Sequence, residues 1–208
     1  DKSLMFKELE KMNINSFYIP SSYSLRYLKF PCVIRPTKGI GSNHVYVCRT
    51  PKEANRALRV LKILRREPLI QEYLLTKKKF SLDLLINKEG KIVRLLSLTK
   101  VSKRLVKKII RDLEEFFKQI GYFSFASPQF LLVDDKPYLT EINPRLSFYF
   151  YGLDFGANFP AAFHELFIEE KEHTKKIFKF KKYFPDFFKA SKIYVEKTED
   201  FLPVIKHF

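Results

Sequence analysis

Apolar residues along this chain follow two different spacings. In four stretches they recur every three or four positions, which is the spacing of one helix face, at about residues 1–12, 50–66, 102–120 and 159–170. Between them lie short apolar runs bounded by polar turns, which predict strands at about residues 32–35, 44–48, 69–74, 80–86 and 92–98, and on both sides of residues 134–136. Hairpins separated by helices predict an α+β protein with largely antiparallel sheets, in place of the strict alternation of a doubly wound fold.

Three of the predicted helices begin at a residue that can cap them. Asp1 and Ser102 stand just before the first and the third helix. Residues 50–53 (Thr-Pro-Lys-Glu) form a capping box with proline at the first helical position. Gly121 predicts the end of the third helix, because glycine tolerates the left-handed conformation that often follows a helix.

The most informative segment runs from Gln129 to Arg145. Two apolar runs flank a polar turn at residues 134–136, which predicts a β-hairpin. If the strands pair symmetrically about this turn, Gln129 lies opposite Glu141, and Asn143 shares the face of Glu141 because side chains alternate along a strand. Hard oxygen ligands of this kind suit Mg²⁺ bridging nucleotide phosphates, and Arg145 could hold an anion. The alternative interpretation is a solvated hairpin with a polar face.

A glycine-containing turn at residues 37–42 (Thr-Lys-Gly-Ile-Gly-Ser) joins two of the predicted strands. A strand–loop–strand unit of this kind can lay backbone N–H groups over a phosphate. The signal is weak by itself, because many turns look like it.

The composition adds charge to this picture. The chain has 208 residues, 46% of them hydrophobic, which is enough for one sizeable core or two small lobes. Its formal net charge is +16, with cation clusters at residues 77–79, 103–111 and 171–182. Such clusters often form solvated faces, but they could also attract nucleic acid or an acidic partner protein. Because most Phe and Tyr residues lie in core-like apolar stretches, we do not expect nucleic-acid binding as the main role.

Other function classes find little support. No apolar run approaches 18 residues, so we expect no membrane span. Cys32 and Cys48 fall inside predicted strands, which favours buried thiols in a cytoplasmic protein. The four histidines form no spaced set of metal ligands. Because the sequence begins at Asp1 rather than Met, we expect an upstream domain to be missing from it.

Several segments together resemble the ATP-grasp family, most closely the ATP-binding domains of the carbamoyl-phosphate synthase large subunit. The resemblance covers about residues 1–170, and its most specific part is Gln129 and Glu141 twelve positions apart, followed by Ile-Asn-Pro-Arg. The other marks are Asp1-Lys2 and residues 30–36, 39–42, 69–74 and 81–83. The resemblance implies two α+β lobes with largely antiparallel sheets enclosing a nucleotide cleft, with about residues 40–74 as the smaller lobe. Residues 171–208 would form a basic C-terminal extension packed on this domain.

The resemblance also implies a role for each matching residue. Arg35 would hold the α-phosphate, Lys2 would add charge near the phosphates, and the loop with Gly39, Gly41 and Ser42 would close over the β- and γ-phosphates. Glu72 and the backbone through Leu74 would line the adenine edge. Gln129 and Glu141 would bind a first Mg²⁺, and Glu141 and Asn143 a second, with Mn²⁺ as an alternative ion. Arg145 would steady the phosphorylated intermediate.

The implied activity is that of an ATP-dependent ligase. Phosphoryl transfer from ATP to a small carboxylate or bicarbonate gives an acyl phosphate, which an amine or ammonia then attacks. Two departures favour a non-catalytic nucleotide-binding domain as the alternative. Lys79 stands where family members carry an acid that grips the ribose, and the connection from Ser97 to Ser102 is short. A third interpretation is a basic module that binds nucleic acid or an acidic carrier protein.

Overall fold

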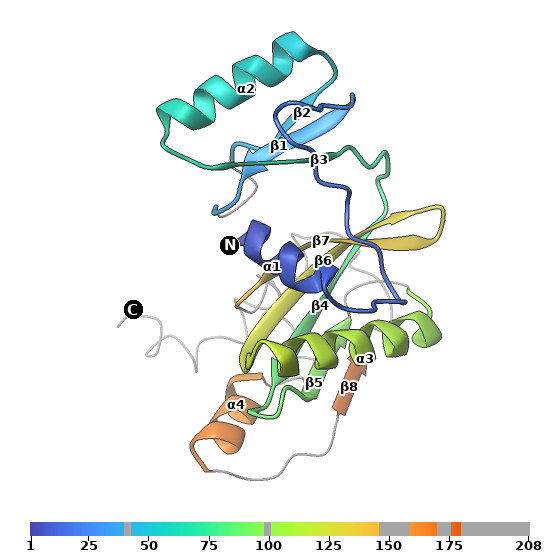
Figure 1. The fold of residues 1–208 in the computed structure, drawn as a ribbon. Helices are drawn as coiled ribbons and strands as arrows, with labels where there is room; N and C mark the ends of the chain where they lie inside the picture. The colour runs from blue at the N-terminus through green and yellow to red at the C-terminus, as the bar shows by residue number, and fades with distance from the viewer. Residues whose placement is uncertain (40–42, 98–100, 146–158, 170–175, 180–208) are drawn as a thin grey trace, which may run out of the picture.

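The structure is a computed structural model that describes residues 1–39, 43–97, 101–145, 159–169 and 176–179. Two lobes are stacked one above the other, and helix α1 (Lys2–Glu10) lies where they meet (Figure 1). Most of the predicted basic extension and the connection at residues 98–100 lie outside the described residues.

The smaller lobe is a three-stranded antiparallel sheet covered by one helix. Its strand order is β2 (Tyr46–Cys48), β1 (Cys32–Pro36), β3 (Pro68–Glu72), and α2 (Pro51–Ile63) lies over one face (Figure 1). The core between helix and sheet consists of the following residues: Cys32, Ile34, Cys48, Ala54, Ala57, Leu61 and Ile70. The sheet therefore begins at Cys32, ahead of the start at about residue 40 that we expected for this lobe.

The larger lobe is a five-stranded sheet with helices on both faces. Its order is β7 (Lys136–Asn143), β6 (Ser124–Val133), β4 (Lys79–Ile86), β5 (Ile92–Ser97), β8 (Lys176–Lys179). Alternate residues of β4 and β5 pack against α1 and α3 (Lys103–Gln119) on one face, and the residues between them pack against α4 (Phe159–Phe167) on the other. The pairs β7–β6, β6–β4 and β4–β5 are antiparallel, whereas β8 runs parallel to β5.

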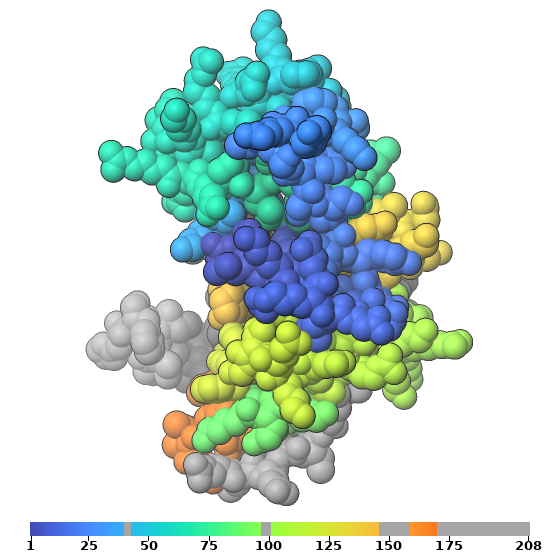
Figure 2. Space-filling model, in the orientation of Figure 1, coloured from blue at the N-terminus to red at the C-terminus, as the bar shows by residue number. Residues whose placement is uncertain are grey.

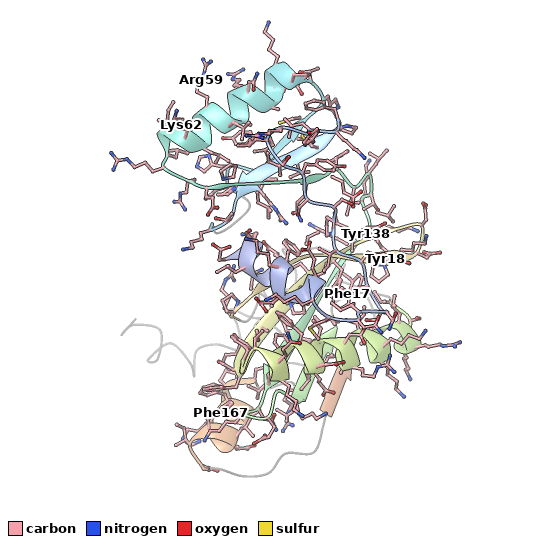
Figure 3. All side chains as sticks on the ribbon, viewed as in Figure 1. Phe17, Tyr18, Arg59, Lys62, Tyr138 and Phe167 are labelled. Carbon is pink, nitrogen blue, oxygen red and sulfur yellow. The ribbon has the colours of Figure 1, made fainter. Side chains whose placement is uncertain are left out.

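A linker between α1 and β1 fastens the lobes to one another. Phe17 packs edge-on against Phe130 at 5.7 Å between ring centroids, and Tyr18 stacks on Tyr138 at 5.2 Å (Figure 3). The linker then pairs with β3 of the smaller lobe, where the backbone N–H of Tyr23 donates to the carbonyl of Ile70 at 2.9 Å. One segment thus contacts both sheets and limits how far they can separate.

The helix starts predicted from sequence are confirmed. Asp1 Oδ1 accepts from the backbone N–H groups of Ser3 and Leu4, and the hydroxyls of Thr50 and Ser102 accept from the third residue of their helices. Helix α2 ends earlier than predicted, because the chain turns at Arg65 with a φ of 52°.

Two further predictions concern burial and membranes. Cys32 and Cys48 are buried free thiols that lie opposite one another on β1 and β2. Within the described ranges, no helix is both long and apolar enough to cross a membrane.

Candidate active site

The hairpin between β6 and β7 is tighter than its sequence predicts. Only Asp134 and Asp135 form the turn, both with positive φ (48° and 59°), and Lys136 already pairs with Val133. The predicted three-residue turn at residues 134–136 was therefore wrong, because it was one residue too long. A regular two-residue turn would place position 140 opposite Gln129. The pairing of Gln129 with Glu141 is nevertheless present, because the register shifts by one residue just after Gln129.

The register shift is a β-bulge that contains Thr140. Bulges place two residues of one strand against one of the other and redirect the side chains around them. Here Thr140, Glu141 and Asn143 line the space between the lobes, whereas Ile142 packs against the core on the opposite face. The amide Nδ2 of Asn143 donates to Glu141 Oε1 at 2.8 Å, which orients the carboxylate. The bulge thus brings the oxygen-bearing side chains to one wall.

That wall belongs to a cavity of about 390 Å³ between the two sheets. In the space-filling view the smaller lobe lies above α1 and the larger lobe below it (Figure 2). The larger lobe contributes these residues to the cavity: Gln129, Leu131, Thr140, Glu141, Asn143 and Arg145. The smaller lobe and α1 contribute these: Lys2, Val33, Arg35, Gly39, Val45, Val47, Gln71, Glu72, Tyr73 and Leu74. Most of the predicted site residues therefore meet in one place.

Arg35 connects the two lobes at the floor of this cavity. Its Nη2 donates to Gln71 Oε1 at 2.6 Å in the neighbouring strand and to the Thr140 carbonyl at 2.7 Å across the cleft. Its Nε is buried without a hydrogen-bond partner among the described residues. Burial lowers the pKa of the Arg35 guanidinium, and the charge of Glu141 partly offsets this effect. A donor held in this way favours an anionic ligand, because an unpaired buried donor costs free energy.

Lys2 supplies a second cation at the start of α1. Its backbone N–H donates to the Thr37 carbonyl at 3.0 Å, and its Nζ lies 3.8 Å from Glu141 Oε2. Burial lowers the pKa of the Lys2 ammonium, with Glu141 opposing this shift and Arg35 adding to it. One carboxylate therefore lies close to two cations, an arrangement that leaves net positive charge for a polyanion.

The chemistry of the oxygen donors fits Mg²⁺ held together with phosphates. In the part of the chain that the structure describes, no group of three His, Cys, Asp or Glu side chains is arranged so that it could hold a metal ion. A metal ion here would use the Glu141 carboxylate with the amide oxygens of Gln129 and Asn143. Mg²⁺ is commonly bound by one or two carboxylates plus substrate phosphates, so this donor set suits an ion that arrives with a nucleotide.

Of the remaining predicted residues, some line the cavity and others do not or lie outside the described residues. Arg145 is exposed and lines the cavity, and Leu74 is also among the lining residues. The Glu72 carboxylate accepts from the Ser21 backbone N–H at 2.8 Å, so it also fastens the linker. Gly41 and Ser42 lie outside the described residues. Lys79 is exposed and is not among the residues lining the cavity.

Sequence reasoning missed two residues that build the site. Gln71 is almost fully buried and holds Arg35, and Thr140 offers its carbonyl to the same guanidinium. A polar residue inside the apolar strand at positions 69–74 was the available signal for Gln71. No sequence signal identified the Thr140 carbonyl, because backbone groups carry no residue type.

A comparison with known families settles the fold. The sequence model of the ATP-grasp domain matches residues 1–147. This chain belongs to the ATP-grasp family. The resemblance to the ATP-grasp family is thereby confirmed, as is the α+β fold with its largely antiparallel sheets.

Solved structures share this ATP-grasp fold at low sequence identity. The biotin carboxylase domain of Hydrogenobacter thermophilus 2-oxoglutarate carboxylase, solved with MgADP, ADP and bicarbonate, aligns with a TM-score of 0.64 and 15% identity over 85% of this chain and 45% of that one. Bacillus anthracis D-alanine–D-alanine ligase, solved with ATP, aligns with a TM-score of 0.53 and 17% identity over 69% of this chain and 52% of that one. Bacillus licheniformis L-amino acid ligase aligns with a TM-score of 0.56 and 15% identity over 76% of this chain and 45% of that one. The chain spans about half the length of these proteins.

Proposed function

We propose that this chain is an ATP-dependent ligase that activates a carboxylate as an acyl phosphate for attack by an amine. One observation carries the proposal: in an ATP-grasp chain, Gln129, Glu141 and Asn143 line the same interlobe cavity as the cations Lys2 and Arg35. Phosphoryl transfer needs chiefly positioning and charge neutralisation, and these residue types supply both.

The proposal keeps for each residue the role that the ATP-grasp resemblance implies. The phosphates of ATP lie near Lys2, Arg35 and Gly39, and the adenine lies toward Glu72 and Leu74 at the other end. Gln129, Glu141 and Asn143 would hold two Mg²⁺ ions, with Mn²⁺ as an alternative, and such ions would supply charge neutralisation at the transferred phosphoryl group. Arg145, which also lines the cavity, contacts the phosphorylated intermediate.

The reaction proceeds in two balanced steps. A carboxylate oxygen of the acceptor attacks the γ-phosphorus, the bond to the β–γ bridging oxygen breaks, and ADP leaves. The amine nitrogen then attacks the acyl carbon, the bond between that carbon and the phosphate oxygen breaks, and the proton lost by the nitrogen leaves with the phosphate. The residues described need not form a covalent bond with the substrate, so a side-chain nucleophile is not required.

Glu141→Ala tests the metal and phosphate assignment. The variant removes the carboxylate shared by both proposed ions, so MgATP-dependent ADP release should fall at least a hundredfold while the fold stays intact. Glu115→Ala, at an exposed position on α3, is the matched control and should behave like the wild type. Normal turnover by Glu141→Ala would show that the metal assignment is wrong, and a wild type that neither binds nor hydrolyses ATP would refute the function.

A non-catalytic nucleotide-binding domain is the second candidate. The observation that favours it is Lys79, at the sequence position where family members carry an acid that holds the ribose. The Lys79 side chain is exposed, and it is not among the residues that line the cavity. Calorimetry that detects MgATP binding, with every tested acceptor left unmodified, would support this alternative.

Several finer expectations stay predictions. Among them are a carbamoyl-phosphate synthase-like reaction with bicarbonate and ammonia, an acidic carrier protein as partner and a cytoplasmic location.

A further inference from the structure

A second cavity of about 490 Å³ opens beside the first. It lies between α1, the C-terminal end of α3 and the end of β7, which are neighbours in the larger lobe (Figure 1). The two cavities share four lining residues: Lys2, Gly39, Glu141 and Asn143. These are the residues at the phosphate end of the proposed nucleotide site, so the second cavity adjoins the place where the γ-phosphate is transferred.

The wall of the second cavity is mostly apolar. Phe116 and Phe117 form a buried floor, and Met5 and Ile142 are partly exposed beside them. Further out, Leu4 and Ile120 expose 60% and 42% of their surface, although both are large hydrophobic residues. Large apolar side chains facing an open cavity favour a ligand with an apolar body, because covering them removes apolar surface from water.

Carboxylates outnumber cations around this cavity. The carboxylates of Asp1, Glu8 and Glu141 line it, and the ammonium groups of Lys2 and Lys38 line it as well. The carboxylates would repel a second negative group on the ligand. The Asp1 carboxylate also caps α1 through the N–H groups of Ser3 and Leu4, so these backbone donors are already used. A ligand anion must therefore be held by side chains, and Lys2 and Asn143 stand at the junction with the first cavity.

We propose that this second cavity binds the acceptor of the ligase and selects a carboxylic acid with an apolar body, such as a hydrophobic amino acid. The carboxylate points toward Lys2 and Asn143, and the apolar body lies against Leu4, Met5 and Ile120. This placement brings a carboxylate oxygen next to the γ-phosphate, which is the pair of groups that the first step joins. The inference rests on the proposed ligase function and adds the substrate class to it.

The test uses the chain with MgATP and four acceptors: L-leucine, L-phenylalanine, L-glutamate and bicarbonate. Hydroxylamine serves as the amine and traps the acyl phosphate as a hydroxamate, while ADP release is followed in parallel. We expect L-leucine and L-phenylalanine to support ADP release and hydroxamate formation, and L-glutamate and bicarbonate to give only the background rate. Saturation-transfer NMR of L-phenylalanine with MgADP present measures binding independently of turnover.

Two variants place a charge on the apolar wall at positions where folding should tolerate it. Ile120→Glu and Leu4→Glu should each raise the KM for L-phenylalanine at least tenfold and abolish its NMR signal, with MgATP affinity unchanged. Ile63→Glu, at a position 74% exposed on α2 and remote from both cavities, is the matched control and should match the wild type.

The outcomes separate the inference from the function on which it rests. If MgATP binds but L-glutamate or bicarbonate is the preferred acceptor, or if both wall variants keep the wild-type KM and NMR signal, the apolar acceptor site is wrong and the ligase proposal survives. Failure of the apolar amino acids to bind in the presence of MgADP also overturns the inference. If the wild type binds no MgATP, the proposed function and the inference both fail.

Discussion

The contact between Arg35 and Gln71 predicts a measurable coupling between stability and nucleotide binding. Gln71 is 2% exposed, and its Oε1 accepts from Arg35 Nη2 at 2.6 Å. Its Nε2 donates to the Pro20 carbonyl at 3.3 Å, a weaker contact. Gln71→Leu keeps the side-chain volume close to that of glutamine but removes both contacts. The guanidinium then keeps only the Thr140 carbonyl of its two protein acceptors.

The size of the effect follows from the charge on the donor. A hydrogen bond to a charged group contributes about 1.5–3 kcal/mol, so Gln71→Leu should lower the free energy of unfolding by about 2 kcal/mol. In a chain of this size that corresponds to a Tm lower by about 4–8 °C. Because Arg35 is no longer held from the β3 side, the dissociation constant for MgATP should rise by about tenfold.

A double-mutant cycle isolates the contact itself. Urea unfolding of the wild type, Gln71→Leu, Arg35→Met and the double variant gives the coupling free energy between the two side chains. We expect about 1.5–3 kcal/mol. Gln119→Leu, at an exposed position at the end of α3, is the control for the amide-to-isobutyl change and should alter stability by less than about 0.5 kcal/mol. A coupling indistinguishable from zero would refute the role assigned to Gln71.

Two further predictions follow from the pKa shifts. Burial lowers the pKa of the Lys2 ammonium, so its charge is costly in the unliganded fold. Lys2→Met should therefore leave the Tm in thermal denaturation unchanged or raised. The same variant should weaken MgATP binding about tenfold in a titration. Burial raises the pKa of the Cys48 thiol from 9.0 to about 11, so as the pH rises the thiol ionises in the unfolded chain before it does in the folded one. The neutral Cys48 thiol therefore contributes its full share to the free energy of unfolding below pH 9, and this share is lost as the pH rises toward 11. Cys48→Ala should therefore lose less stability than the wild type between pH 8 and 10.5 in urea unfolding, and equal losses would contradict the assignment.

The hairpin shows how far sequence patterning reaches. Alternation and an assumed centre of symmetry placed Gln129 opposite Glu141, which is correct. The assumed turn was one residue too long, and the bulge at Thr140 supplies the missing offset on the β7 side. Two errors of opposite sign therefore cancelled at the site. Bulges depend on local hydrogen bonding and on contacts from other elements, here Arg35, so short-range periodicity alone does not reveal them.

Strand β8 was missed for a different reason. Its four residues are Lys-Ile-Phe-Lys, which alternate poorly, and they lie in a lysine-rich segment that predicts a solvated surface. The strand exists because it pairs in parallel with β5, from Arg94–Lys176 to Ser97–Lys179. Such pairing joins positions far apart in the sequence, whereas the helices were predictable because their caps and apolar spacing are local.

The charge balance of the first cavity explains why its residues act as a group. Among the described residues that line it, Lys2, Arg35 and Arg145 are cationic, whereas Glu72 and Glu141 are anionic. Glu72 already accepts a hydrogen bond from the linker, and Glu141 lies 3.8 Å from Lys2. Burial disfavours the charged forms of Lys2 and Arg35, so the unliganded cleft holds cations that the protein only partly neutralises. A nucleotide polyphosphate removes that imbalance while Glu141, Gln129 and Asn143 still offer oxygens to a metal ion. The same groups that are costly in the empty site thus become favourable when the ligand is bound, which ties the stability of the lobe junction to nucleotide binding.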